Sequence, residues 1–263
     1  MIQKLKVYQV DAFTKTVFGG NPASVCVLDK WLPDPKLQQV AAEHNQPETA
    51  FIVRKDRVFE IRWFTPTCEV DLCGHATLAS AYVLYNELNY SGEKIHFETI
   101  NRGDLYVKKQ NGMFELDFPA DSPEETFMPY GLIDAFGYEP LNVLKGKDDY
   151  LVVFESEKQI INLKPDMDAV ASVDARGVIC TAPGTDVDFV SRFFGPQSGI
   201  DEDPVTGSAH TTLTPYWVDK LGKTKLTARQ LSARKGYLEV ELADTRVKIS
   251  GSAVLYMKGE IML

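Results

Sequence analysis

Apolar and polar positions follow several distinct patterns along this chain, and each pattern predicts an element. Residues 34–44 place apolar side chains three and four positions apart, which is typical of a short amphipathic helix. Residues 75–87 are apolar on nearly every helical face, so this helix must be buried on all sides. Runs 50–53 and 58–64 have the length and composition of paired strands. The chain therefore mixes helices with strands.

The same succession of patterns occurs twice in the chain. The first half reads RWFTP at 62–66 and GHAT at 74–77, and the second half reads RFFGP at 192–196 and GSAH at 207–210. Helix and strand patterns elsewhere in the halves match at offsets of roughly 130 residues, which indicates a repeat unit of half the chain. A repeat of that size predicts two similar domains.

We expect an α+β fold of two duplicated domains, each a mostly antiparallel or mixed sheet wrapped around a central helix. The central helix of the second domain is predicted at residues 208–221. The domains are placed at residues 1–119 and 120–263, with the boundary in a stretch that contains two prolines. The sequence leaves open whether the last strand, 253–263, returns to the first domain.

Charge and cysteine usage narrow the class of function. The net charge of −9 argues against a nucleic-acid partner, which selects for clustered Lys and Arg. No uninterrupted apolar run reaches the roughly 18 residues of a membrane helix, and the N-terminus leads into a strand pattern rather than a signal sequence. The four cysteines lack paired metal-type spacing, which indicates free thiols in a reducing cytoplasm. We expect a cytoplasmic protein without nucleic-acid or membrane partners.

A glycine precedes a predicted helix in each half. The free N–H groups at a helix N-terminus bind anions, so two such ends facing one cleft would form a site for a small anionic metabolite. The predicted substrate-binding residues are Asn21, Cys73, Gly74, Ala76, Thr206, Gly207 and Ala209.

Glu48 is a difference between the two halves. At an offset of 130 it aligns with Val178, so the second half has no matching carboxylate. Near a cleft, Glu48 would act as a general acid/base with a pKa raised by partial burial. The alternative is an ordinary surface glutamate.

Three more residues are candidates for catalysis. His75 aligns with Ser208, and both would face a ligand from the first turn of a helix; alternatively, His75 is structural and Ser208 caps its helix. Asp203 directly precedes Pro204 and would orient an amino or hydroxyl group of the ligand. Together with Asp201 and Glu202 it would otherwise compensate the helix dipole.

Cys73 lies next to the same helix start as His75. A positive helix end lowers the pKa of a thiol. Its counterpart in the second half is Thr206, which cannot supply a second thiol. The histidines show no metal-ligand spacing, and no dinucleotide fingerprint opens a helix, so we expect neither a metal nor a cofactor.

Several motifs together resemble a known family. They are Asp11-Ala-Phe-Thr with Phe18-Gly-Gly-Asn21-Pro22, Asn45-x-x-Glu48-Thr-x-Phe51, Phe64-Thr-Pro66 with Cys73-Gly74-His75-Ala-Thr, and Asp203-Pro-x-Thr-Gly-Ser208-Ala. In this order and spacing they are similar to the PhzF-like family of phenazine biosynthesis. The resemblance implies the diaminopimelate-epimerase fold with the active site between two domains, cofactor-independent isomerase chemistry and, commonly, a homodimer.

The resemblance also implies roles for individual residues. In the family's characterised phenazine enzyme, a glutamate moves a proton within a dihydro-hydroxyanthranilate ring. That glutamate corresponds to Glu48, and its companions correspond to His75, Asp203 and Ser208. Cys73 departs from the phenazine enzyme, which carries a small residue there, so the substrate is left open.

The asymmetry between the halves favours one mechanism. Related epimerases and racemases use two cysteines, one from each half, to invert a stereocentre. A proton shift along one face of a conjugated system needs only one carboxyl group, and Glu48 supplies it. The alternatives are an epimerase or racemase that uses Cys73 with a different second base, and a catalytically silent protein that binds small carboxylates.

Overall fold

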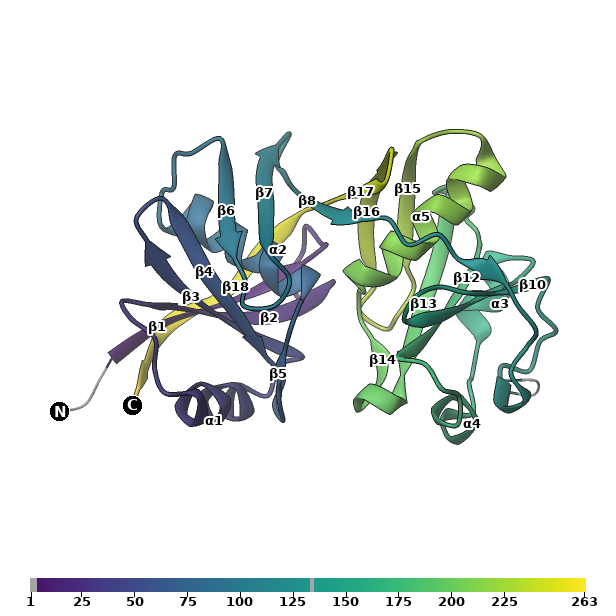
Figure 1. Ribbon diagram of the computed structural model, residues 1–263, viewed down its shortest axis with the longest axis horizontal. Helices are drawn as coiled ribbons and strands as arrows, with labels where there is room; N and C mark the ends of the chain where they lie inside the picture. Colours follow the sequence, from purple (N-terminus) through teal and green to yellow (C-terminus); the bar gives the residue numbers. More distant parts are fainter. Residues whose placement is uncertain (1–3, 133–134) are drawn as a thin grey trace. The chain divides into compact units, whose positions relative to one another are not determined.

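The computed structural model describes residues 4–132 and 135–263 and divides into two compact units (Figure 1). One unit comprises the chain up to Asp117 together with Ser250–Leu263, and the other comprises Phe118–Ile249. The chain leaves the first unit within β8 (Met113–Pro119) and returns to it within β17 (Arg246–Gly251). Helices and strands are mixed in both units, so the predicted α+β class is confirmed.

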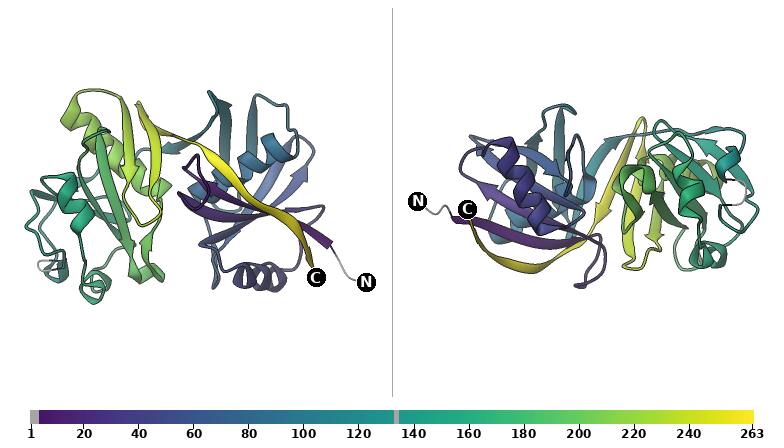
Figure 2. Two further views of the ribbon diagram at one scale, coloured as in Figure 1. Left: turned by 180° about the vertical axis from the view of Figure 1, so that it is seen from behind. Right: turned by 90° about the horizontal axis from the view of Figure 1, so that it is seen from below.

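The first unit is built on one mixed sheet. Its other strands are β1 (Lys4–Ala12), β2 (Asn21–Leu28), β3 (Glu48–Lys55), β4 (Val58–Phe64), β5 (Glu69–Val70), β6 (Lys94–Glu98), β7 (Asp104–Gln110) and β18 (Ala253–Met262). Neighbouring strands follow the order β18–β1–β2–β3–β4–β6–β7–β8, with β5 added to β4. The pairs β2–β3 and β4–β6 are parallel and the others are antiparallel. The final strand β18 runs beside β1 along its whole length (Figure 2).

Two helices of the first unit lie on the sheet. Helix α2 (Gly74–Tyr82) contacts β1, β2, β3 and β18, and it continues into a π-helical turn, η1 (Val83–Glu87). Its residues 75–81 are all buried, as the apolar pattern predicts. Helix α1 (Asp34–His44) packs Leu37 and Val40 into a separate cluster with side chains of β1, β2 and β3. It ends where Asn45 adopts a left-handed conformation with φ 49°.

The second unit repeats the strand pairing of the first. Its other strands are β9 (Glu124–Glu125), β10 (Asn142–Lys145), β11 (Asp149–Val153), β12 (Gly177–Pro183), β13 (Phe189–Gly195), β14 (Ile200–Asp203), β15 (Lys225–Gln230) and β16 (Gly236–Ala243). Parallel β11–β12, antiparallel β12–β13, parallel β13–β15 and antiparallel β15–β16 follow one another, as β2–β3, β3–β4, β4–β6 and β6–β7 do in the first unit. The sequence repeat is thus a repeat of topology.

Helix α5 (Gly207–Leu221) has the place in the second unit that α2 has in the first. It contacts β11, β15 and β16, and it ends at Gly222, whose φ of 65° suits glycine. The smaller helices are η2 (Tyr130–Leu132), α3 (Glu157–Asn162), α4 (Met167–Ala171) and η3 (Pro196–Ser198). Among the described residues, no helix is long and apolar enough to cross a membrane.

Candidate active site

Four side chains that the sequence singled out meet at the start of α2. Asn21 is the first residue of β2, and Glu48 is the first residue of β3. Because β2 and β3 are parallel neighbours, their first residues lie at the same edge of the sheet. Cys73 is the N-cap residue of α2, and His75 is the second residue of that helix. The glycine turn therefore brings the helix start to the edge where the two strands begin.

His75 is the centre of this cluster. Its Nε2 lies 3.1 Å from Glu48 Oε2, and its Nδ1 lies 3.2 Å from Asn21 Nδ2 and 3.5 Å from Cys73 Sγ. The contact between His75 Nε2 and Glu48 Oε2 has the distance of an ion pair, and the Asn21 amide lies beside the other ring nitrogen. The side chains of His75 and Glu48 are 6% and 13% exposed. Two ionisable groups are thus in contact in a nearly buried setting.

The environment shifts the pKa of His75 and Cys73 upwards. Burial lowers the pKa of His75, but the contact with Cys73 and the charged carboxylate of Glu48 outweigh it and raise that pKa well above its ordinary value. Burial, and secondly the charge of Glu48, raise the pKa of the Cys73 thiol to about 11. The expected lowering of the thiol pKa by the helix end is therefore wrong, because burial outweighs it. At neutral pH Cys73 is protonated and uncharged, so Glu48 is the partner whose charge stabilises a protonated His75.

Glu48, Cys73 and His75 also offer three potential metal ligands within 4.8 Å of one another. Both ring nitrogens of His75 already contact neighbours within the cluster, Glu48 at Nε2 and Asn21 at Nδ1. The geometry fits acid–base chemistry better than metal binding.

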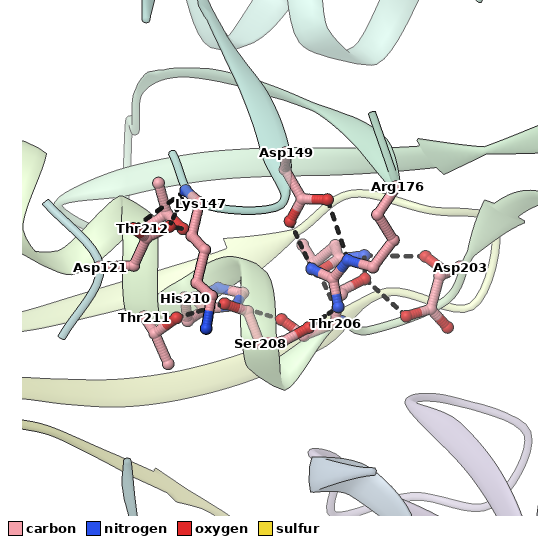
Figure 3. Close-up of polar contacts among 11 residues, drawn as sticks. Asp121, Lys147, Asp149, Arg176, Asp203, Thr206, Ser208, His210, Thr211 and Thr212 are labelled. Atoms are coloured by element: carbon pink, nitrogen blue, oxygen red, sulfur yellow. Dashed lines mark hydrogen bonds and ion pairs between the residues drawn. The ribbon is translucent and has the colours of Figure 1, made fainter. Parts of the chain in front are cut away.

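In the second unit, the predicted residues lie around the start of α5 (Figure 3). Asp203 ends β14, and its Oδ2 accepts a hydrogen bond of 2.6 Å from the hydroxyl of Thr206, the N-cap residue. The buried Gln230 accepts from the Thr206 N–H and donates to the Asp203 carbonyl, both at 2.8 Å. Ser208 is the second residue of α5, as His75 is of α2. The link between Asp203 and Thr206 fixes the carboxylate relative to the helix start.

The remaining predicted binding residues lie in the first turns of these two helices. Gly74 is partly exposed, whereas Ala76, Gly207 and Ala209 are buried.

Two functional candidates were missed by the sequence analysis, Asp149 and Arg176. The Arg176 guanidinium donates from Nε to Asp149 Oδ1 at 3.0 Å, from Nη2 to Asp149 Oδ2, and from Nη1 to Ser208 Oγ at 2.9 Å (Figure 3). Asp149 is the first residue of β11, and Arg176 directly precedes β12. They lie at the starts of two parallel strands, as Asn21 and Glu48 do, but no motif in the sequence marks them.

Three expectations about the second unit are wrong in detail. Ser208 does not cap α5, because the N-cap residue is Thr206 and the Ser208 hydroxyl accepts from Arg176. The acids Asp201 to Asp203 belong to β14 rather than to the first turn of α5, which contains no acid. Strand register aligns Glu48 with Gly177 instead of Val178, because Thr49 pairs with Phe64 as Val178 pairs with Phe194. Gly177 has no side chain, so the second unit still lacks a matching carboxylate at this place.

Comparison with known proteins decides the family. The model of the PhzC-PhzF family, described as phenazine biosynthesis-like protein, matches residues 10–259. The chain belongs to this family. An uncharacterized isomerase of Pseudomonas aeruginosa is 51% identical to it over 260 residues, which cover 99% of this chain and 100% of the relative. The human phenazine biosynthesis-like domain-containing protein is 35% identical, with 98% of this chain and 99% of that protein covered.

Solved structures agree with this assignment to the PhzF family. A PhzF-family protein of Enterococcus faecalis superposes with a TM-score of 0.96 at 44% identity, covering 99% of this chain and 100% of that one. A hydroxyproline epimerase of Agrobacterium vitis has a TM-score of 0.65 at 11% identity, covering 99% and 93% of the two chains, and shows the fold alone. The fold is thus the diaminopimelate epimerase-like fold that the resemblance in sequence implies.

Proposed function

We propose that this protein is a cofactor-independent isomerase that moves a proton on a small, carboxylate-bearing, cyclic or conjugated metabolite. The observation that carries the proposal is the contact of 3.1 Å between Glu48 Oε2 and His75 Nε2 in a nearly buried setting. The PhzF family and the isomerase names of its members support the reaction class.

In the proposed reaction, the carboxylate of Glu48 takes a proton from a carbon of the substrate. The electron pair of that C–H bond enters the conjugated system, and Glu48 returns the proton to another carbon on the same face. The imidazole of His75, whose Nε2 lies 3.1 Å from Glu48 Oε2, positions the carboxylate and stabilises its negative charge before it takes the proton and after it returns it. A positioned acid/base of this kind contributes about 10²–10⁴ in rate.

The second unit would bind the substrate rather than exchange its proton. Asp203, held by Thr206, would orient an amino or hydroxyl group, and Ser208 with the amides that follow Gly207 would bind an anionic oxygen. The amides after Gly74 would stabilise charge that develops in the transition state.

We also propose a cellular compartment and an oligomeric state for the enzyme. All four cysteines are free, which supports a reducing compartment, the cytoplasm. The homodimer is proposed on the resemblance to the family. Light scattering of the purified protein tests it, and a monomeric mass would contradict it.

Solvent exchange tests the reaction. The protein is incubated in D₂O with cyclohexenyl and cyclohexadienyl carboxylates, their amino and hydroxy derivatives, and proline, and carbon-bound hydrogen is followed by proton NMR. We expect deuterium at two carbons of a cyclic acid, together with migration of its double bond. Exchange at a single stereocentre, with inversion of its configuration, would instead indicate an epimerase that uses Cys73. Tight binding of a carboxylate without any exchange would indicate a silent binding protein.

A further inference from the structure

Arg176 lies in the second unit close to the place that Glu48 has in the first. Register aligns Glu48 with Gly177, and Arg176 directly precedes Gly177. In each unit a charged residue at the start of the second of two parallel strands contacts the second residue of the central helix: Glu48 contacts His75, and Arg176 contacts Ser208. The sign of the charge is reversed between the units.

The chemistry of the guanidinium group fixes the direction of the contact with Ser208. Arginine has only hydrogen-bond donors and stays protonated in proteins, so it cannot shuttle a proton. At the contact of 2.9 Å, Ser208 Oγ must therefore be the acceptor. The hydroxyl hydrogen of Ser208 is left to be donated elsewhere, and accepting a charge-assisted bond makes a hydroxyl a stronger donor.

Asp149 sets the plane of the guanidinium group. Its side chain is 2% exposed, and both of its oxygens accept from Arg176, one from Nε and one from Nη2. The guanidinium carbon also lies 5.5 Å from the centre of the Phe193 ring. A guanidinium group that is bound on one side by a buried carboxylate and covered by an aromatic ring has little rotational freedom, so Nη1 is directed at Ser208.

We propose that Arg176, fixed by Asp149, is a positioning residue that turns the Ser208 hydroxyl into a dedicated hydrogen-bond donor for the substrate carboxylate. The inference rests on the proposed function and adds to it the substrate group that the second unit recognises. Glu48 and His75 exchange a proton, whereas Asp149, Arg176 and Ser208 recognise an anionic oxygen. A neutral amide or ester in place of that carboxylate would bind less well.

The test uses the acid that the wild-type protein exchanges fastest in the D₂O panel. The variants are Ser208→Ala, Arg176→Met and the two combined. Loss of a hydrogen bond to a charged group should raise the KM of Ser208→Ala and of Arg176→Met by about tenfold each, with kcat changed far less. Because Arg176 acts through Ser208, Arg176→Met should have no further effect on KM in the Ser208→Ala protein.

Removing Arg176 alone leaves the Asp149 charge buried and unpaired, which can unfold a protein. The double variant Asp149→Asn with Arg176→Met removes both charges and should show the same KM as Arg176→Met. Arg62→Met is the matched control: Arg62 also binds a carboxylate through two nitrogens, that of Glu69, and lies 5.2 Å from the centre of the Phe64 ring, but it contacts no residue of the proposed site. It should leave KM unchanged.

The outcomes separate the inference from the function on which it rests. A wild-type protein that exchanges no acid of the panel overturns both. If the wild type is active, then an unchanged KM in the Asp149→Asn, Arg176→Met protein overturns the inference alone. So does an equal KM increase from Arg176→Met in the wild-type and Ser208→Ala backgrounds, since Arg176 would then not act through Ser208.

Discussion

Cys73 and Glu48 both contact His75, but only one of them is suited to give and take a proton. The thiol has a pKa of about 11 and keeps its proton at neutral pH, whereas the carboxylate is in direct contact with the Nε2 of His75. A helix N-terminus next to Cys73 favours a thiolate, but loss of hydration disfavours it more strongly. The residue that can give and take a proton is Glu48.

Replacing Cys73 by serine should therefore leave exchange within about tenfold of wild type, the loss expected from one altered hydrogen bond. A thiol that itself shuttled the proton would cost about 10²–10⁴ on removal. The rate of deuterium incorporation in the Cys73→Ser protein decides between the two. Serine is preferable to alkylation, because Cys68 is exposed and would react as well. A loss larger than a hundredfold would support the Cys73 epimerase instead.

Sequence analysis identified the functional residues that stand in local motifs and missed those that do not. Glu48 and His75 stand in recognisable motifs beside a proline and a glycine, and the structure brings them into contact. Asp149 and Arg176 are separated by 26 residues of chain and stand in no motif. Only the pairing of β11 with β12 makes them neighbours, and register cannot be read from a single strand.

Helix α5 carries a buried histidine that is neutral in the folded protein. His210 Nδ1 lies 2.8 Å from the Thr206 carbonyl, and the side chain is 0% exposed. Burial lowers the pKa of His210 to about 4, although the hydrogen bond to Thr206 partly opposes the shift. Protonation would place a charge in the core of the second unit.

Stability should therefore fall as the pH drops from about 6.5 to about 4. The unfolded chain binds a proton near pH 6.5 and the folded chain only near pH 4, so acid favours unfolding between them. The loss amounts to about 3 kcal/mol. Urea unfolding of wild type and of His210→Asn at pH 7 and pH 4.5 measures it. The asparagine variant, which does not titrate, should lose less stability; equal losses in both proteins would contradict the assignment to His210.

Elements with a strong apolar pattern were predicted closely, and short or irregular ones were not. The strand pair 50–53 and 58–64 corresponds to β3 and β4, and the helix predicted at 208–221 corresponds to α5. β5 and β14 were missed because both are short and largely acidic, without alternation of apolar residues. The helix predicted at 75–87 changes to a π-helical turn at Val83, a change of hydrogen bonding that has no side-chain pattern.

The two units differ in how they are assembled from the chain. Residues Phe118–Ile249 are one continuous segment with its own apolar core, whereas the first unit needs β18 from the far end of the chain. The segment has roughly 130 residues, a size at which single domains commonly fold alone. We therefore expect the second unit to be able to fold by itself and the first unit to depend on both ends of the chain.

The isolated segment 118–249 should therefore fold cooperatively, and the isolated segment 1–117 should not, because it lacks the strand that covers β1. Circular dichroism during thermal unfolding, with dispersed amide signals in NMR spectra, distinguishes the two outcomes. Adding residues 250–263 through a flexible linker should restore folding of the first segment. A disordered 118–249 would show that the second unit depends on the rest of the molecule.

The one-carboxylate mechanism is tested most directly by Glu48→Gln. Glutamine keeps the shape and one oxygen of the side chain but cannot accept and return a proton at neutral pH. The rate of carbon-bound deuterium incorporation should fall by about 10²–10⁴ while the thermal midpoint and substrate binding stay close to wild type. Glu43→Gln, at an exposed position of α1, is the matched control and should exchange at the wild-type rate. Undiminished exchange by a folded Glu48→Gln protein would contradict the account.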